Sequence, residues 1–324
     1  MEGEAEVVGK NWTVADIPSQ VGRRALITGA NSGIGYYTAL ELARKGANVL
    51  LACRNKAKGE AALARLKVEV PGARAEMVLL DLASLESVRR FAEAEDALGI
   101  PLDLLINNAG VMAPKRRLET VDGFEVQFGT NVLGHFALTA LLLPALERAA
   151  KGSQRPRVVT LASIAHKTGR LDFDDLQSAS LYSPMGAYRQ SKLANLMFGM
   201  ELARRLQTAG PPTSRILSVA AHPGVANTPL FQTGEHPALE KMVRRAFGVM
   251  IGTFLNTDVQ GAVPTLFAAT APDAQDGEYY GPQGFQEMRG GDVGPAKVFP
   301  QAHDEAAAAR LWSECERLSG IALL

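Results

Sequence analysis

A tyrosine and a lysine stand four residues apart in the segment Ala-Tyr-Arg-Gln-Ser-Lys-Leu-Ala-Asn, which covers Ala187 to Asn195. On a helix, positions four apart lie on the same face, so Tyr188 and Lys192 can act on one site. The pair supplies a proton donor with a cation beside it. The alternative is an ordinary surface pair on an amphipathic helix.

A glycine-rich segment lies far upstream, where Thr28 to Gly35 reads Thr-Gly-Ala-Asn-Ser-Gly-Ile-Gly. A glycine turn between a strand and a helix lets the backbone approach a phosphate, and the helix N-terminus favours negative charge. The spacing is Gly-x-x-x-Gly-x-Gly, and a merely tight turn is the alternative. The predicted cofactor-binding residues of this turn are Gly29, Asn31, Ser32, Gly33, Ile34 and Gly35. Together with the tyrosine and lysine, the turn predicts a protein that binds a dinucleotide and transfers a hydride.

The residue after the second predicted strand indicates which dinucleotide is bound. A carboxylate at this place would bind the ribose 2′-hydroxyl of NAD, whereas the chain has Arg54. Arginine suits the 2′-phosphate of NADP through charge-assisted hydrogen bonds, so we expect NADP(H). Lys56 and Lys58 add positive potential. A solvated surface charge is the alternative for all three.

Two further turns follow predicted strands. Asp81 and Leu82 stand where an adenine amino group could meet a carboxylate, although Asp81 could instead cap a helix. The segment from Asn107 to Gly110 has small residues that would let a cofactor lie over the strand ends. Its asparagines could also tie adjacent strands together. We expect Asn108, Ala109 and Gly110 to contact the cofactor.

Composition excludes several classes of protein. The 324 residues are 47% hydrophobic with a formal net charge of +0, which gives no electrostatic case for nucleic acid or an acidic membrane. The two cysteines, Cys53 and Cys315, are far apart, form no metal-ligand spacing and are predicted to be small buried hydrophobes. We expect no metal site.

The acidic N-terminus, Met-Glu-Gly-Glu-Ala-Glu, does not resemble a signal peptide. No run of 18 apolar residues occurs, and the longest apolar stretch, from Phe136 to Leu146, reads as a buried helix. We therefore expect a cytoplasmic protein without stable membrane insertion.

The elements that must position these residues alternate between strand and helix. This alternation predicts one doubly wound α/β domain of the Rossmann type, with a parallel sheet covered on both faces. Residues 1–22 are expected to form an extension that Trp12 packs down, residues 23–324 the domain, and about 225–256 a variable lid. Expected strands are 24–28, 48–53, 75–80, 102–106, 157–162 and 215–220, and expected helices are 33–45, 56–70, 84–97, 122–149 and 188–208.

These residues carry a family resemblance. The glycine turn, Asn107 to Gly110, Asn131, Ser163, the tyrosine–lysine pair and His222-Pro-Gly224 resemble the short-chain dehydrogenase/reductases from about Arg23 to Gly290. Four further sequence segments narrow the resemblance to the retinol dehydrogenase-like branch, which includes the WW-domain oxidoreductase. These segments are Ala52-Cys-Arg54, Asn131-Val-Leu-Gly-His-Phe136, Ser191-Lys-Leu-Ala-Asn195 and Tyr279-Tyr-Gly-Pro-x-Gly-Phe285. Vertebrate membrane members of that branch carry an N-terminal apolar anchor. We expect none in this chain, and therefore expect a soluble bacterial-type enzyme.

The resemblance implies four catalytic residues. Tyr188 would be the general acid when a carbonyl is reduced. The positive charge of Lys192, with that of oxidised nicotinamide, would lower the pKa of the phenol from about 10, and Lys192 would also hold the nicotinamide ribose. Ser163 would bind the substrate oxygen, and Asn131 would hold a water that relays protons to Lys192. The alternative for Ser163 is a helix cap, and the alternative for Asn131 is a buried side chain that only ties neighbouring segments together.

The loop after the sixth predicted strand would contact the nicotinamide, as in the family. Its predicted cofactor-binding residues are Pro223, Gly224, Val225 and Thr228. His222, like His135 and His166, is interpreted as structural.

An apolar helical stripe falls in the predicted lid, at Met242, Val243, Ala246, Phe247, Met250, Ile251 and Phe254. It could pack on the sheet edge, touch a membrane, or form the wall of an apolar substrate pocket. On the last interpretation the substrates are bulky apolar aldehydes or ketones.

The sequence thus predicts an NADP(H)-dependent oxidoreductase for a small carbonyl or alcohol substrate. A cofactor-binding sensor or scaffold without turnover is the alternative, and double-bond reduction like that of the protochlorophyllide reductases is a third. Many members of the family pair through the helices that carry Asn131 and Tyr188, so a homo-oligomer is possible. The sequence does not identify the substrate.

Overall fold

The computed structural model describes residues 9, 11–225, 256–290 and 292–324. The predicted Thr228 contact and the apolar stripe of the predicted lid lie outside these residues.

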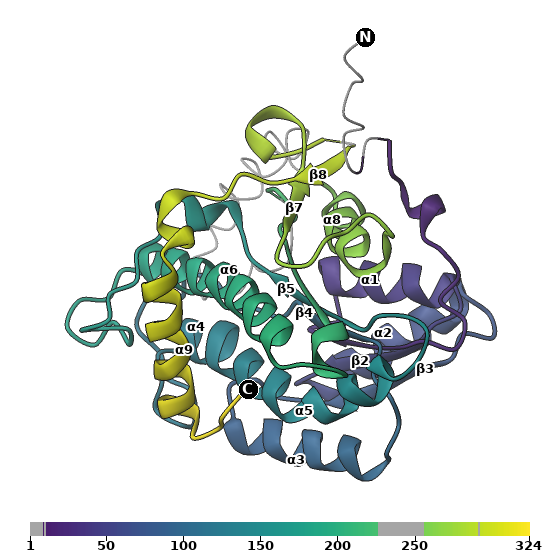
Figure 1. Cartoon of the computed structure of the whole chain (residues 1–324), viewed down its shortest axis with the longest axis horizontal. Helices are drawn as coiled ribbons and strands as arrows, with labels where there is room; N and C mark the ends of the chain where they lie inside the picture. The colour runs from purple at the N-terminus through teal and green to yellow at the C-terminus, as the bar shows by residue number, and fades with distance from the viewer. Residues whose placement is uncertain (1–8, 10, 226–255, 291) are drawn as a thin grey trace.

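An 8-stranded sheet forms the centre of the molecule, in the order β3-β2-β1-β4-β5-β6-β7-β8 (Figure 1). All neighbouring strands are parallel except β7 and β8, which pair antiparallel. Every residue of β1, β4, β5 and β6 is buried, as expected for parallel strands covered on both faces. The strands are β1 Arg24–Thr28, β2 Asn48–Cys53, β3 Ala75–Leu79, β4 Leu104–Asn107, β5 Arg157–Leu161, β6 Leu217–Ala221, β7 Tyr279–Pro282 and β8 Val293–Pro295.

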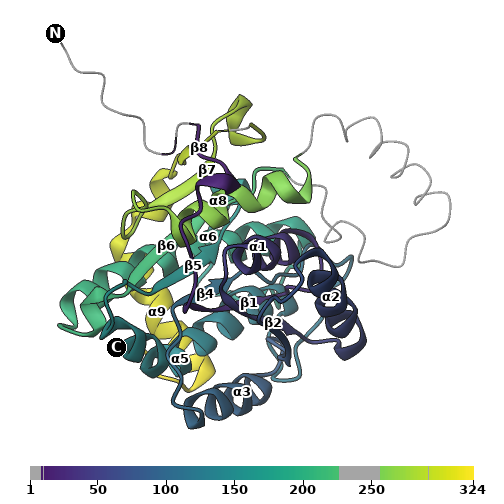
Figure 2. The same ribbon diagram turned by 90° about the vertical axis from the view of Figure 1, so that its right-hand side faces the viewer.

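Helices cover both faces of the sheet and enclose two separate hydrophobic cores (Figure 2). On one face lie α1 Gly33–Arg44, α2 Lys56–Glu69 and α8 Asp258–Thr270. On the other lie α3 Leu85–Ala97, α5 Gly134–Ala150, α6 Pro184–Thr208 and α9 Glu305–Ser319. The predicted doubly wound α/β fold is confirmed. Short turns complete the chain: 3-10 helices η1 Val14–Asp16, η3 Ile164–Thr168, η4 Thr213–Arg215, η6 Phe285–Glu287 and η7 Pro300–His303, α4 Val126–Phe128, and the π-helical turn η2 Gly129–Leu133.

Local sequence signals account for several helix boundaries. Ser84 accepts a hydrogen bond from Ser87 N and caps α3, as predicted. Ser183 caps α6 and Pro184 occupies its first turn, so this helix begins four residues before the predicted start at Tyr188. The predicted helix over 122–149 is wrong in its detail, because a π-helical turn divides α4 from α5.

Three smaller predictions concern burial. Cys53 and Cys315 are free thiols and are buried. Trp12 packs edge to face on Phe267 of α8, with ring centroids 5.3 Å apart, and so holds the N-terminal extension against the domain. The run Val126–Ala150 is long and apolar enough to cross a membrane, but it is mostly buried inside the domain. It therefore behaves as the core helix that the sequence predicts.

Candidate active site

A cavity of about 490 Å³ opens along the carboxyl ends of the parallel strands. It lies where ligands bind in open α/β sheets. It brings together all predicted site residues in the described part of the chain except Asn131. Several other residues, for which the sequence predicts no role, also line the cavity: Leu80, Val111, Met112, Thr130, Leu161, Ala162, Ile164 and Met185.

The glycine turn between β1 and α1 is shaped by backbone that only glycine adopts readily. Gly29 and Gly33 have φ of 67° and 57°, in the left-handed region. Gly35 is required for close packing, because an added Cβ would lie 2.4 Å from Asn108 Nδ2. The Ser32 side chain makes no capping hydrogen bond, so the first N–H groups of α1 remain free to bind an anion.

Thr28 joins this turn to the end of β4. Its Oγ1 accepts hydrogen bonds from Asn108 N and Ala109 N, both at 2.9 Å, while Asn108 Nδ2 donates to Thr28 O at 2.6 Å. Asn108 therefore ties neighbouring strands together, as predicted. His135 of α5 completes the junction: its Nδ1 donates to Asn131 O, which leaves Nε2 to accept from the Thr28 hydroxyl at 2.9 Å. His135 is thus structural, and burial lowers its pKa to about 4.

At the other end of the glycine turn, Arg54 and Lys58 line the cavity and are exposed. Neither forms an ion pair with a carboxylate of the described residues. Both cations are therefore available to an anionic ligand. Lys56, by contrast, is 3.9 Å from Glu60 and does not line the cavity, so it is an ordinary surface residue of α2.

Helix α3 is capped by Ser84 and not by Asp81, whose predicted contact with adenine stays a prediction. Asp81 Oδ1 accepts from Ala83 N at 3.0 Å, which shapes the turn before α3, and the residue also lines the cavity. Leu82 lies beside it, with its backbone carbonyl close against α5. An added Cβ at Gly134 would be only 2.4 Å from Leu82 O.

Tyr188, Lys192 and Ser163 line one end of the cavity. Burial raises the pKa of Tyr188, and a hydrogen bond with the Ser163 side chain acts in the opposite direction. Burial lowers the pKa of Lys192 from 10.5 to about 8. Without cofactor, desolvation therefore dominates, and the predicted lowering of the tyrosine pKa by Lys192 together with oxidised nicotinamide stays a prediction. Lys192 Nζ donates to Leu161 O at 2.9 Å instead.

Ser163 has the capping role considered from the sequence, and its predicted contact with the substrate oxygen stays a prediction. Its Oγ accepts from Ala165 N at 3.2 Å and caps the 3-10 turn η3. The residue nonetheless lines the cavity beside Tyr188. The cap fixes the hydroxyl group at the end of β5.

Asn131 is fully buried in η2 and does not line the cavity. Its amide group binds both backbone groups of Val111 and donates to Ser191 Oγ at 3.0 Å. These contacts support the interpretation as a buried polar tie, and the predicted water-holding role stays a prediction. An added Cβ at Gly110 would lie 3.4 Å from Asn131 Oδ1 and 3.8 Å from Lys192 Nζ, so Asn131 and Lys192 both lie close to Gly110.

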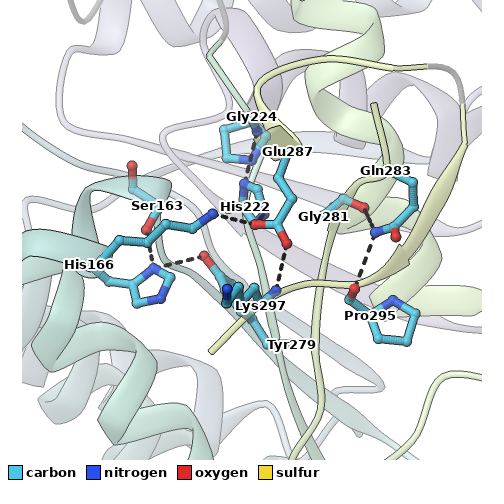
Figure 3. A network of polar contacts seen from close by, with 12 residues as sticks. Ser163, His166, His222, Gly224, Tyr279, Gly281, Gln283, Glu287, Pro295 and Lys297 are labelled. Carbon is cyan, nitrogen blue, oxygen red and sulfur yellow. Dashed lines mark hydrogen bonds and ion pairs between the residues drawn. The ribbon is translucent and has the colours of Figure 1, made fainter. Parts of the chain in front are cut away.

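Pro223, Gly224 and Val225 close the cavity after β6. Figure 3 shows His222 beneath this loop, with its ring toward Gly224. Gly224 N donates to His222 Nδ1 at 3.1 Å, and burial lowers the pKa of His222 to about 3. The histidine is therefore neutral and shapes the loop.

No group of three metal-binding side chains occurs among the residues that the structure describes. The cavity has instead the parts of a nicotinamide dinucleotide site. A glycine turn lies at a helix N-terminus, whose backbone N–H groups can bind a phosphate, and a tyrosine, a lysine and a serine meet at the far end. The fold and site thus define a Rossmann-type oxidoreductase.

Comparisons with known proteins agree with this class. Residues 23–238 match the short chain dehydrogenase family model, and the chain belongs to this family, which uses NAD(P) cofactors. It is 42% identical to human retinol dehydrogenase 13 over 304 residues, covering 93% of this chain and 85% of the relative. It is 40% identical to mouse polyprenol dehydrogenase, covering 94% and 86% of the two chains. A crystal structure of an uncharacterised protein from Mycobacterium paratuberculosis is 43% identical, with a TM-score of 0.75 over 97% of this chain and 99% of that chain.

Proposed function

We propose that the chain is an NADP(H)-dependent oxidoreductase that interconverts a bulky apolar carbonyl compound and its alcohol. The observation that carries the proposal is the placement of Tyr188, Lys192 and Ser163 at one end of the cavity and of Arg54 at the other. A dinucleotide bound across the cavity would have its phosphates at the glycine turn and its nicotinamide beside the tyrosine.

Tyr188 supplies the proton for carbonyl reduction. The raised pKa of its phenol keeps it protonated at neutral pH, as a general acid must be. Ser163 Oγ binds the carbonyl oxygen and Tyr188 Oη protonates it. When bound, the dihydronicotinamide supplies the hydride that reaches the carbonyl carbon. Lys192 stabilises the phenolate that remains, and the reverse sequence oxidises the alcohol.

Arg54 and Lys58 support the choice of NADP(H). Two cations without a carboxylate partner in the described chain favour a ligand with an additional phosphate. NAD would need a carboxylate for its 2′-hydroxyl, whereas this position carries Arg54.

The side chains around the tyrosine support an apolar substrate. Val111, Met112, Ile164 and Met185 line the cavity with Tyr188, and Met185 is 40% exposed at its rim. Methionine adapts its shape, so this wall suits bulky apolar groups. The names of the relatives, retinol dehydrogenase and polyprenol dehydrogenase, indicate substrates of that kind for those proteins.

The test is NADPH oxidation, followed by loss of absorbance, across aldehydes and ketones of increasing size. We expect turnover that is higher for bulky apolar carbonyls than for small polar ones. Met112→Ser combined with Met185→Ser should raise KM for the bulky compounds more than for the small ones. Binding of NADPH without turnover of any compound would support the sensor alternative. A cytoplasmic location stays a prediction, which fractionation of cells producing the protein would test.

A further inference from the structure

The connection between β7 and β8 has a backbone that its residue types do not favour. Gln286 and Glu287 have φ of 49° and 59°, so two consecutive residues other than glycine adopt the left-handed conformation. The turn is closed tightly, because an added Cβ at Gly284 would lie 1.9 Å from Arg289 O. Such strain persists only where surrounding contacts enforce it, and it occurs often at functional sites.

The contacts of the Glu287 carboxylate provide this enforcement. Oε2 accepts from Lys167 Nζ at 2.7 Å. Oε1 accepts from Lys297 N at 2.7 Å (Figure 3). Lys167 belongs to η3, the turn that Ser163 caps. The two charged side chains are only 18% and 20% exposed, so this ion pair is more shielded than an ordinary surface pair.

The same connection supports the loop that faces the predicted nicotinamide site. Val225 N donates to Met288 O at 2.8 Å, directly beside Glu287 in sequence. An added Cβ at Gly224 would lie 2.4 Å from Met288 O, so only glycine permits this approach. Asn256 Nδ2 donates to Pro223 O at 2.9 Å and holds the loop at its other side.

His222 lies between the two halves of this arrangement. Because Nδ1 accepts from Gly224 N, the ring proton is on Nε2, which points toward Glu287 Oε2 at 3.8 Å. Nε2 has no hydrogen-bond partner, and the ring is fully buried. An added Cβ at Gly281 would lie 1.9 Å from Nε2, so the ring packs directly on β7. The Glu287 carboxylate therefore lies near the buried N–H, and the Lys167 ammonium that it binds also acts on the ring.

We propose that Glu287 is a positioning residue that fixes the Ser163 turn relative to the nicotinamide-facing loop Pro223–Val225. It acts through Lys167 on one side and through Met288 and His222 on the other, and it touches neither substrate nor cofactor. The inference rests on the proposed function of the same cavity. Hydride transfer is sensitive to small displacements, since a misplacement of about 1 Å can lower a rate by about a hundredfold.

The experiment compares Glu287→Gln and Glu287→Gly with the wild type. Glutamine keeps an acceptor for Lys297 N but loses the charge that holds Lys167, and glycine removes the carboxylate at a position whose φ glycine favours. We expect kcat to fall tenfold or more in both variants. The Kd of NADPH should change less than about twofold, because the phosphates and adenosine bind at the distant glycine turn and Arg54.

A second readout does not depend on turnover. The fluorescence lifetime of bound NADPH reports how rigidly its nicotinamide ring is held. We expect a shorter lifetime in both Glu287 variants at unchanged Kd. The exchanged pair Lys167→Glu with Glu287→Lys should recover part of the lifetime and of kcat relative to either single substitution.

Gln283→Ala is the matched control in the same hairpin. Gln283 Nε2 donates to Gly281 O at 3.1 Å and to Pro295 O at 3.2 Å, on the side of the hairpin away from the Ser163 turn (Figure 3). This variant should lower Tm without changing kcat or the NADPH lifetime.

Two outcomes would overturn the positioning role. One is a wild-type kcat and lifetime in both Glu287 variants. The other is a loss of kcat and lifetime in Gln283→Ala as large as in the Glu287 variants at the same Tm, which would show that lower stability alone causes the effect. A wild-type protein that binds NADPH but reduces no carbonyl would contradict the proposed function instead, while the lifetime comparison would still test Glu287.

Discussion

Lys192 has a side chain whose charge the proposed chemistry needs and whose burial opposes folding. Its pKa is about 8 in the folded protein against 10.5 in the unfolded chain, because the ammonium group is desolvated. Between these two values the unfolded state binds more protons, so the free energy of unfolding rises with pH across this window. Below about pH 8 the full cost of the buried charge is present.

Lys192→Met should therefore stabilise the protein without cofactor while abolishing turnover. The lowered pKa corresponds to a cost of about 3 kcal/mol, and the lost hydrogen bond to Leu161 O offsets about 1 kcal/mol of the gain. We expect a higher Tm than wild type at pH 7 and a difference that shrinks steadily as the pH rises from about 8 to 10. Thermal unfolding measured from pH 6 to 10 checks this. An unchanged or lower Tm at pH 7 would show that Lys192 is not buried as a charge.

Tyr188→Phe should leave NADPH binding nearly intact and reduce turnover by a factor of about 10² to 10⁴, the usual contribution of a positioned acid. In the wild type, burial raises the pKa of Tyr188, so carbonyl reduction should not fall between pH 6 and 8 through loss of its proton. Reduction should decline above about pH 8, where Lys192 loses its charge. Steady-state kinetics across this range test both statements. Near-normal turnover of Tyr188→Phe would exclude the mechanism.

Arg54→Asp should reverse the preference between NADPH and NADH. Removing a charged partner of the 2′-phosphate costs about 1.5–3 kcal/mol, which corresponds to roughly ten- to a hundredfold in kcat/KM. Lys56→Ala is the control, because Lys56 pairs with Glu60 and does not line the cavity. Equal efficiency of the wild type with both cofactors would show that this interpretation of Arg54 is wrong.

Among the elements, those with strong local signals could be predicted from sequence. The strands β1 and β2 and the capped helix α3 have the expected bounds, because apolar runs and a serine cap determine them locally. The π-helical turn η2 could not be predicted, since one additional residue in a turn leaves little trace in an apolar pattern. For the same reason the contact between His135 and the Asn131 carbonyl was missed. It depends on two helical segments whose relative register only the structure shows.

Two helical glycines with ordinary φ, Gly35 in the first turn of α1 and Gly199 in α6, can be compared. At Gly35 an added Cβ would lie 2.4 Å from Asn108 Nδ2 and 2.7 Å from Gly29 O, whereas at Gly199 of α6 the nearest atom is 3.7 Å away. Gly35→Ala should lower the free energy of unfolding by about 1–3 kcal/mol through overpacking and weaken NADPH binding. Gly199→Ala should raise it by about 0.5–1 kcal/mol, as alanine does in a helix interior. Denaturant unfolding measures both, and equal effects would contradict the close packing at Gly35.

At the scale of the whole molecule, the C-terminal third was least predictable. Tyr279 to Phe285 was noted only as a motif, although it begins β7 and leads to the connection that carries Glu287. The Glu287 carboxylate contacts Lys167, 120 residues away, and the backbone of Lys297, 10 residues away. Neither contact leaves a periodic signal in the sequence. Helix α9 was not predicted, although its caps, Asp304 and Gly320, are visible in the sequence.

Helix α9 bears on the possible homo-oligomer. Trp312 stacks on Phe198 of α6 with centroids 5.8 Å apart, and it meets Phe136 of α5 edge to face at 5.3 Å. Arg205 of α6 lies over the same indole ring, 4.3 Å from its centroid. Helix α5 directly follows Asn131, and α6 carries Tyr188. The family resemblance implies that the subunits of many relatives pair through these two helices. In this chain α9 packs on that face, so we expect that subunits do not pair through α5 and α6.

The measurement is hydrogen–deuterium exchange at two protein concentrations, combined with the molar mass from light scattering. Protection of α5 and α6 should not depend on concentration, and a mass near 34.5 kDa is expected unless another face pairs. Trp312→Ser should loosen α9, expose the apolar face and make protection of α6 depend on concentration, whereas His303→Ser, at an exposed position before α9, should not. Concentration-dependent protection of α5 and α6 in the wild type would show that they form a subunit interface despite α9.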